Sequence, residues 1–223
     1  MCGRFALEEI PNGLLDVFGL ASPPWSPRYN LAPTDYSPVI LDENGRTSLQ
    51  ALCWGLVPFW SRDKGIGAWL INARAETADE KPAFRAAFRH RRCLVPASGF
   101  YEWKREGRKR TPFYFSPPGA EPLVMGGLWE EWTGGDEIIR SFAILTSEAN
   151  ADMAPVHDRM PVILKSGDWA RWLDPRVRRK SELADLLRPV ADGFLASRVV
   201  GSYVNKPGNE GAECLRAVGD LRL

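Results

Sequence analysis

Turn-forming residues are spread along the whole chain, with 20 Gly and 18 Pro among 223 residues. Pro interrupts helices and Gly favours turns, so this sequence predicts many short strands rather than long helices. A chain of this length is long enough to bury one sizeable core. We therefore predict an α+β fold in a single domain over residues 1–223. Its core is expected to be strand-rich and antiparallel, with curved, barrel-like sheets and peripheral helices.

Apolar segments bounded by turn signals predict short strands at residues 38–42, 47–54, 93–96, 99–104, 111–116, 123–132, 140–146 and 161–165. Asn44-Gly45, between the first two, is typical of a tight hairpin turn. Helical spacing predicts helices at 14–20 and 83–89. Two more are expected where the hydroxyls of Ser166 and Ser181 are suited to cap a helix N-terminus. The Pro- and Ser-rich segment 21–38 is expected to be a long ordered loop.

Charge and cysteine content limit the classes of function. The net charge is +1, so no overall positive field draws the chain to nucleic acid, although basic residues cluster locally at 85–92, 104–110 and 176–180. The four cysteines form no Cys-x-x-Cys pair, and with only two histidines no zinc-ligand spacing appears, so we expect no metal and no cofactor. Free thiols, with no secretion signal or membrane-spanning run, indicate a cytoplasmic protein. We expect a monomer.

Cys2 directly follows the initiator Met1. Removal of Met1 would give Cys2 a free α-amine beside its thiol. Such an amine attacks an aldehyde to form an imine, and the thiol can then close on the imine carbon to give a thiazolidine. The reference pKa of an α-amine is roughly 8, so part of it is unprotonated near neutral pH. A cysteine near a terminus is more often a small buried apolar residue, so a nucleophile needs partners elsewhere in the chain.

Polar residues interrupt two apolar segments. If residues 72–76 are extended, Asn72, Arg74 and Glu76 share one face. That face is either a polar site or a hydrogen-bond network that only fixes loops. Glu102 lies between Tyr101 and Trp103. On a solvent face this carboxylate would be ordinary, whereas in a cavity desolvation would raise its pKa and let it exchange protons near neutral pH.

His157 and two aromatic residues give further indications. His157 lies between two expected strands, with acidic and basic neighbours, although a lone histidine is more often structural than catalytic. Phe59 and Trp60 follow a proline in an expected loop. Exposed aromatics near arginines suit base stacking or wedge insertion into a nucleic acid. Core packing is the expected role of most of the nine tryptophans.

Taken together and in this order, these segments resemble the SRAP family (SOS response-associated peptidase), whose members covalently capture abasic sites in DNA. The resemblance covers nearly the whole chain. It is carried by residues 1–5 (MCGRF), 28–33 (RYNLAP), 54–56 (WGL), 71–77 (INARAET), 99–103 (GFYEW) and 157–161 (HDRMP).

The resemblance implies a role for each matching residue. Processed Cys2 would attack the ring-opened sugar aldehyde, Asn72 would hold the N-terminus and sugar, Glu102 would shuttle protons, and His157 would assist ring opening. The DNA-binding residues implied are of two kinds, namely arginines for phosphates flanking the lesion (Arg4, Arg74 and Arg159) and residues that support or stack on the splayed strand (Pro33, Phe59 and Trp60). An abasic sugar lacks its base and can enter a narrow pocket at little unstacking cost.

The leading hypothesis is therefore an enzyme-like covalent sensor of abasic sites in single-stranded DNA, with lyase-like imine chemistry, acting in the DNA damage response and nucleoid-associated when bound. Two alternatives remain. One is a cysteine-type peptidase or autopeptidase that removes Met1 or a short prefix, using Cys2, His157 and Glu102 as nucleophile, base and orienter. The other is a non-enzymatic nucleic-acid binding module in which Cys2 is merely buried.

Overall fold

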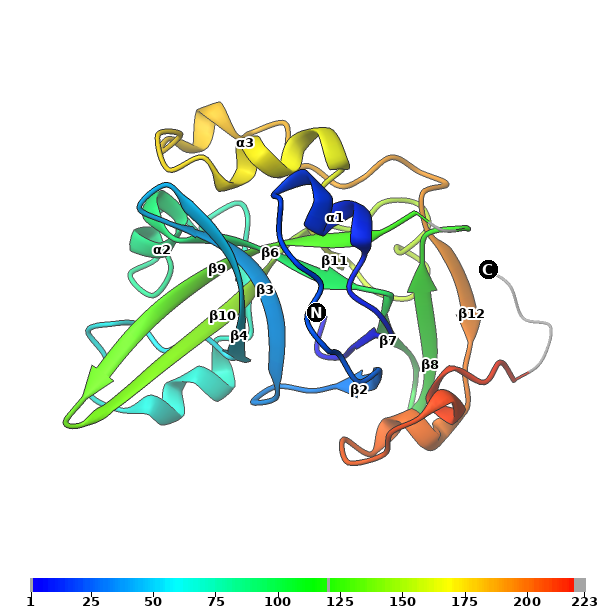
Figure 1. The fold of residues 1–223 in the computed structure, drawn as a ribbon. Coiled ribbons are helices and arrows are strands. Elements are labelled where there is room, and N and C mark those ends of the chain that lie inside the picture. Colours follow the sequence, from blue (N-terminus) through cyan, green and yellow to red (C-terminus); the bar gives the residue numbers. More distant parts are fainter. Residues whose placement is uncertain (1, 120, 219–223) are drawn as a thin grey trace.

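The computed structural model describes residues 2–119 and 121–218. Its strands, in chain order, are β1 (Phe5–Leu7), β2 (Arg28–Leu31), β3 (Tyr36–Glu43), β4 (Arg46–Trp54), β5 (Asn72–Arg74), β6 (Arg92–Ala97), β7 (Gly99–Glu106), β8 (Lys109–Ser116), β9 (Leu123–Gly134), β10 (Glu137–Glu148), β11 (Arg159–Pro161) and β12 (Ala196–Val199). They form two sheets around the core (Figure 1). The predicted strand-rich single domain is confirmed.

The smaller sheet has five strands in the order β12-β8-β7-β1-β2. The larger has seven, in the order β11-β10-β4-β3-β6-β9, with β5 beside β10. Because β9 also pairs with β10, five strands of the larger sheet close into a ring, which is the predicted barrel-like arrangement. Most pairings are antiparallel, as expected. The exceptions are β4 and β5, which run parallel to β10.

Short helices lie at the periphery, as predicted. They are α1 (Asn12–Val17), α2 (Arg85–His90), α3 (Trp169–Leu173) and five 3-10 helices, η1 (Lys64–Trp69), η2 (Ser166–Asp168), η3 (Lys180–Glu182), η4 (Ser202–Asn205) and η5 (Ala212–Leu215). Figure 1 shows α1 and α3 over one end of the sheets and α2 at the flank of the larger sheet.

The Asn44-Gly45 hairpin is confirmed. Both residues have positive φ, 57° and 82°, which a two-residue turn between twisted antiparallel strands requires. The turn joins β3 and β4, which pair from Tyr36–Cys53 to Glu43–Arg46. The strands predicted elsewhere are also present, most of them longer than expected.

Some element boundaries were wrong. The expected loop 21–38 contains β2, which pairs with β1 and could not be recognised before its partner was known. The first helix stops at Val17, and Gly19 then has a φ of 62°. Neither serine caps a helix. Ser166 is the first residue of η2, and Lys165 occupies the N-cap position. Ser181 lies inside η3, and the N-cap residue there is Arg179, whose amide donates to the Glu182 carboxylate at 3.0 Å.

The strand predicted at 161–165 was also misplaced. The strand in this part of the chain is β11, which begins at Arg159, two residues before the predicted start. Beyond it, Ile163 forms only an isolated bridge with Met125.

Packing between the sheets fixes the position of β1. Phe5 is fully buried and contacts Trp54 edge-on, with 5.1 Å between ring centroids. Behind β1, Ala6 pairs with Gly99 on β7, where a Cβ would lie 2.4 Å from the Tyr114 ring. Only glycine therefore lets β7 approach both neighbours closely. This packing holds the N-terminal segment between the two sheets (Figure 1).

Candidate active site

Cys2 lies just before β1, in the interior between the sheets. Its side chain belongs to the main apolar core and is 1% exposed. The backbone around it is fixed because the Tyr101 amide on β7 donates to the Arg4 carbonyl at 2.9 Å, next to the Phe5–Phe100 pair. The thiol is 4.0 Å from the Arg4 carbonyl oxygen. Met1 lies outside the described residues.

Asn72 reaches Cys2 from the larger sheet. It is the first residue of β5, where it is held opposite Ile144 of β10. Its Nδ2 donates to the Cys2 carbonyl oxygen at 2.8 Å. Its Oδ1 is buried and, within the part of the chain that the structure describes, has no hydrogen-bond partner. The Asn72 side chain thus holds the backbone of Cys2 through Nδ2 and leaves Oδ1 beside Cys2 as a hydrogen-bond acceptor.

Glu102 approaches Cys2 from the smaller sheet. Alternate residues of a strand share a face, so Glu102 points to the same side of β7 as Phe100, whose ring is in the main core. The Glu102 residue is 5% exposed, which answers the question left open by the sequence, since the carboxylate faces the interior. Burial, and next the negative charge of Glu102, raises the pKa of the Cys2 thiol to about 12. The thiol is therefore neutral at pH 7.

Beside Asn72, an ion-pair cluster lies at the end of β10. Arg159 on β11 donates to both carboxylate oxygens of Glu76, at 2.7 and 2.8 Å, and to the Thr146 carbonyl at 2.6 Å. The hydrogen bond from Arg159 is the main reason that the pKa of Glu76 lies below its usual range. Glu76 follows β5 in a turn, so it is not on the strand face that carries Asn72. Arg74, at the end of β5, is exposed.

His157 belongs to this cluster. Its Nδ1 accepts from the Arg159 amide at 3.0 Å and also lies 2.8 Å from a carboxylate oxygen of Asp158. Nδ1 cannot both accept the hydrogen bond from the Arg159 amide and donate one to Asp158. The contact with Asp158 is the weaker of the two, because the Asp158 side chain is 88% exposed and screened by solvent. We therefore assign Nδ1 as the acceptor, which puts the proton of the neutral ring on Nε2.

Arg4 is buried rather than exposed. Its Nη1 donates to Asn30 Oδ1 at 2.7 Å and to the Val204 carbonyl at 2.9 Å, and burial lowers the pKa of its guanidinium. It also lies 5.7 Å from the ring centroid of Trp103. Arg4 and Trp103 line a pocket of about 350 Å³ together with Arg110 and Asn205. Asn30, which fixes Arg4, had no predicted role, because nothing local in its motif indicates a partner near residue 204.

The aromatic residues Phe59 and Trp60 lie in a turn and are 55% and 49% exposed, as expected. Pro33 is half-buried in the turn after β2. Trp69, at the end of η1, is 85% exposed and was not predicted. The sequence gives no signal for it, since its neighbours Gly67 and Ala68 suit a buried segment equally well. Five of the nine tryptophans are buried, namely Trp54, Trp129, Trp132, Trp169 and Trp172.

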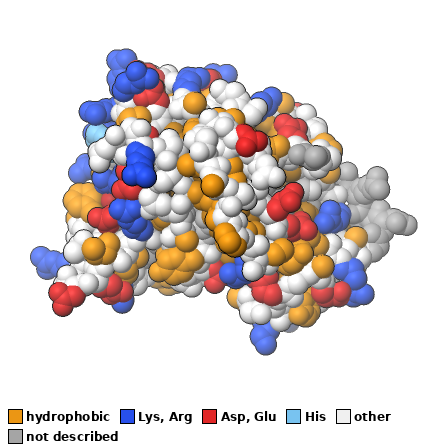
Figure 2. Space-filling model, viewed as in Figure 1, with side chains coloured by type: hydrophobic (Ala, Val, Ile, Leu, Met, Phe, Trp, Pro, Cys, Tyr) orange, Lys and Arg blue, Asp and Glu red, His pale blue; other side chains and the backbone are white. Residues whose placement is uncertain are grey.

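The described residues contain no group of three or more His, Cys, Asp or Glu side chains placed to hold a metal ion. Nor does any helix among them have the length and apolar character needed to cross a membrane. Basic and acidic side chains are intermingled over the face in Figure 2, in keeping with the net charge of +1.

The site consists of a buried cysteine at position 2, an amide that holds its backbone and a carboxylate beside it. A family profile described as SOS response associated peptidase (SRAP) matches residues 1–207. The chain therefore belongs to the SRAP family, as its motifs predicted.

Named relatives are similar over nearly the full length. The chain is 37% identical to the abasic site processing protein YoaM of Bacillus subtilis, covering 97% of this chain and 98% of the relative. It is 31% identical to the abasic site processing protein YedK of Escherichia coli, with 98% and 100% covered. A crystal structure of a protein from Bacteroides thetaiotaomicron matches with a TM-score of 0.86 at 26% identity, covering 97% of this chain and all of that one.

Proposed function

We propose that this protein processes abasic sites in DNA, and that it does so by covalent capture in single-stranded DNA through Cys2 after Met1 is removed. The observation that carries the proposal is the 2.8 Å hydrogen bond from Asn72 to the Cys2 carbonyl, beside the buried Glu102. Relatives named as abasic site processing proteins, similar from end to end, support the same substrate.

The proposed reaction has two bond-forming steps. The α-amine of Cys2 attacks C1′ of the ring-opened sugar aldehyde, and the resulting carbinolamine loses water to give an imine. The Cys2 sulfur then adds to the imine carbon while its proton moves to nitrogen, which closes the thiazolidine. One water molecule is released overall. The linkage shields the lesion from strand cleavage.

The order of the steps follows from the state of the thiol. With a pKa of about 12, the Cys2 thiol is protonated at neutral pH and is a weak nucleophile. The amine, with a reference pKa of roughly 8, attacks first. Glu102 then accepts the thiol proton or passes it to nitrogen, and Asn72 Oδ1 accepts from the amine or a sugar hydroxyl. His157 assists ring opening through its Nε2 proton.

The DNA path is proposed from the exposed and basic residues around this site. Arg74 is exposed and available to a phosphate, whereas Arg4 and Arg159 already have hydrogen-bond acceptors in the protein and must exchange or share them. Phe59 and Trp60 would stack on the splayed strand, and Pro33 would support it. A few local arginines suffice for this binding despite the net charge of +1.

Intact-mass spectrometry tests the proposal. Wild-type protein mixed with an abasic oligonucleotide is expected to lack Met1 and to gain the oligonucleotide mass minus one water. Cys2→Ala is expected to give no thiazolidine. A heat-stable adduct that is undiminished in Cys2→Ala, or the absence of an adduct with wild type, would contradict covalent capture through Cys2.

The peptidase alternative is less favoured, because general proteolysis gives no necessary role to the α-amine that removal of Met1 would free. Burial also raises the pKa of the thiol that would have to act as a thiolate. Cleavage of peptides in trans would favour it. Equal binding of intact and abasic strands without an adduct would favour the non-enzymatic binding module.

A further inference from the structure

The outer face of the smaller sheet, on the side turned away from the main core, carries a basic patch at its open end. Glu102 faces the interior, and alternate residues of a strand share a face, so Trp103 and Arg105 of β7 point outward. Trp103 accordingly packs against the smaller apolar cluster, to which Val204 of the C-terminal segment also belongs. That segment lies beside β8 (Figure 1). Beyond Trp103 the residues of the β7–β8 hairpin are exposed.

Two arginines face each other on this outer face. Arg105 of β7 pairs directly with Arg110 of β8, and both are exposed. Within residues 2–119 and 121–218, neither has an ion-pair partner. The acidic residue nearest the turn, Glu106, lies opposite Lys109 on the other face, 3.3 Å from the Lys104 ammonium. Like charges directly opposite each other destabilise a sheet, so the arginine pair is expected to cost stability until an anion binds over it.

A pocket adjoins this pair. It has a volume of about 350 Å³ and is lined by Arg110 together with Arg4, Trp103 and Asn205. The indole of Trp103 is fixed, because its N–H donates to Asn205 Oδ1 at 2.7 Å. Two guanidinium groups and no carboxylate line the pocket, so its charge is positive. Arginine matches the oxygens of a phosphate in both charge and geometry.

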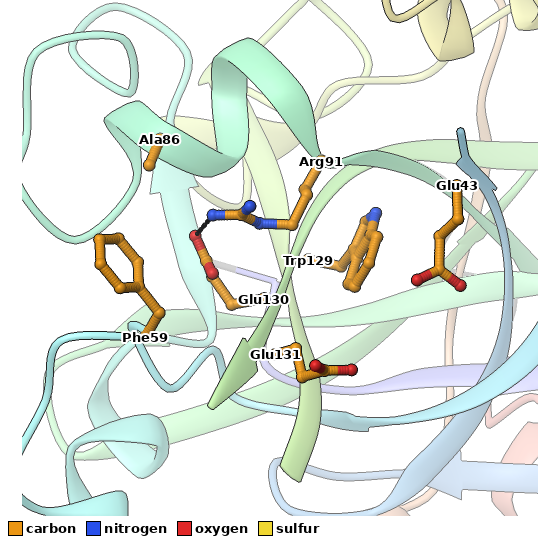
Figure 3. Close-up of a pocket in the computed structure, with 7 residues that line it drawn as sticks. All are labelled: Glu43, Phe59, Ala86, Arg91, Trp129, Glu130 and Glu131. Carbon is orange, nitrogen blue, oxygen red and sulfur yellow. Dashed lines mark hydrogen bonds and ion pairs between the residues drawn. The ribbon is translucent and has the colours of Figure 1, made fainter. Parts of the chain in front are cut away.

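A larger pocket, of about 470 Å³ between α2 and β9, has the opposite character. Three of the residues that line it are glutamates, and Figure 3 shows Arg91 already bound to one of them, Glu130, at 2.7 Å. An anion gains little there, because the positive charge is neutralised within the protein. The outer face of the smaller sheet is therefore the better place for a phosphate.

The patch is within reach of a DNA strand that reacts at Cys2. Arg4 follows Cys2 by two residues and lies beside Tyr101, whose amide donates to the Arg4 carbonyl at 2.9 Å. Arg105 is four residues beyond Tyr101 on the same strand, which at 3.4 Å per residue is about 14 Å. A stacked DNA strand advances about 3.4 Å per nucleotide, so roughly four nucleotides cover this distance.

We propose that the DNA strand, a few nucleotides away from its lesion, binds across the outer face of the smaller sheet, with its phosphates on Arg105 and Arg110. The inference rests on the proposed function and extends the path of the strand beyond Arg4. The phosphates supply the negative charge that relieves the repulsion between the two arginines. Phosphate contacts carry no sequence information, so the bases in this part of the strand have no effect on the binding.

Salt titrations with strands of two lengths test this. The short strand carries a tetrahydrofuran residue, which has no aldehyde, with three nucleotides on each side. Longer strands add six nucleotides on the 5′ or on the 3′ side. For wild type, one of the extensions is expected to steepen the slope of log K against log salt by about 1.4, since two phosphate contacts contribute about 0.7 each. The same extension built from tetrahydrofuran nucleotides, which keep the phosphates but lack bases, is expected to act equally.

Two charge-matched variants separate this face from the overall charge of the hairpin. Arg105→Gln/Arg110→Gln removes two positive charges from the outer face and is expected to abolish the extra slope. Arg108→Gln/Lys109→Gln removes as much charge from the turn and the other face, and is expected to keep it. Because the first variant also relieves the like-charge repulsion, its urea midpoint without DNA is expected to equal or exceed that of wild type.

Three outcomes would overturn the inference. Neither extension steepens the wild-type slope, or both double variants lose the extra slope equally, so that the hairpin acts only through its overall charge. The third is a polyglutamate peptide that binds through the same two arginines while DNA gives no extra slope, which would indicate an acidic protein partner. If wild type forms no adduct with abasic DNA, the proposed function fails, whereas the slopes, measured with a strand that cannot react, still decide whether this face binds DNA.

Discussion

At the scale of single residues, the site is a set of side chains that hold one another in place. The Cys2 carbonyl is bound by Asn72, and the neutral state of the thiol depends on burial and on Glu102. The sequence identified all three residues, but not the contact between them. That contact joins residues 70 positions apart, and local patterns carry no information on such pairs.

The Asn72 contact can be tested directly. Asn72→Ala removes the donor to the Cys2 carbonyl, so the N-terminus loses its fixed orientation. Adduct formation is expected to slow by about 100-fold, because a small misplacement of reacting groups has an effect of that order. Single-turnover gel assays measure the rate. Asn12→Ala, an exposed change on α1, is the control and should match wild type. A rate within threefold of wild type for a folded Asn72→Ala would contradict the role.

At the scale of elements, the end of β10 gathers the polar cluster. β5 runs parallel to it and β11 antiparallel, so Asn72, Arg74 and Arg159 reach one region from separate segments. The sequence predicted β10 and placed a strand near β11. It could not predict that Arg159 binds Glu76, because its prediction placed Glu76 on the Asn72 face of an extended strand that in fact ends at Arg74.

Arg159→Lys separates the charge from the geometry of this cluster. Lysine keeps the positive charge but cannot bind Glu76 with two parallel hydrogen bonds and also reach Thr146. Stability is expected to fall by about 1–2 kcal/mol, the scale of a lost hydrogen bond to a charged group. Urea denaturation measures it. Arg179→Lys, at an exposed arginine just before η3, serves as the control. Equal urea midpoints for wild type and Arg159→Lys would show that the paired hydrogen bonds from Arg159 to Glu76 do not stabilise the fold.

At the scale of the whole molecule, binding to DNA should depend on few charges. With a net charge of +1 and three proposed phosphate contacts, the slope of log K against log salt for single-stranded DNA is expected to be about −2, since each contact contributes about −0.7. Arg74→Ala should reduce its magnitude by about 0.7, whereas Arg46→Ala, at the exposed first residue of β4, should leave it unchanged. Anisotropy titrations between low and moderate salt measure these slopes. A slope near zero would exclude phosphate binding of this kind.

Buried neutral acids also set how stability varies with pH. Burial raises the pKa of the Cys93 thiol and, as the largest cause, those of the Tyr101 and Tyr114 hydroxyls. A raised pKa in the folded state stabilises the fold below the unfolded pKa, and this contribution is lost as pH rises above it. Unfolded thiols ionise at roughly 8.5 and tyrosines at about 10. The urea midpoint is therefore expected to fall between pH 8.5 and 11.

Cys93→Val is the matched variant for this effect, because it keeps an apolar side chain at a buried position and removes the ionisable thiol. Its midpoint should decline less than that of wild type between pH 8.5 and 10. Identical declines would mean that ionisation of Cys93 does not contribute.

The sequence by itself determined the local features: the strand-rich composition, the Asn44-Gly45 turn and the ordered motifs that identify the SRAP family. These depend on residues close together in the chain. Only the tertiary structure decided that Glu102 faces the interior, that Arg4 and Arg159 already have partners, and that Arg4 and Arg110 line one pocket. Each of these depends on pairing between distant segments, such as β1 with β7 and β5 with β10, and on which side chains then lose contact with water.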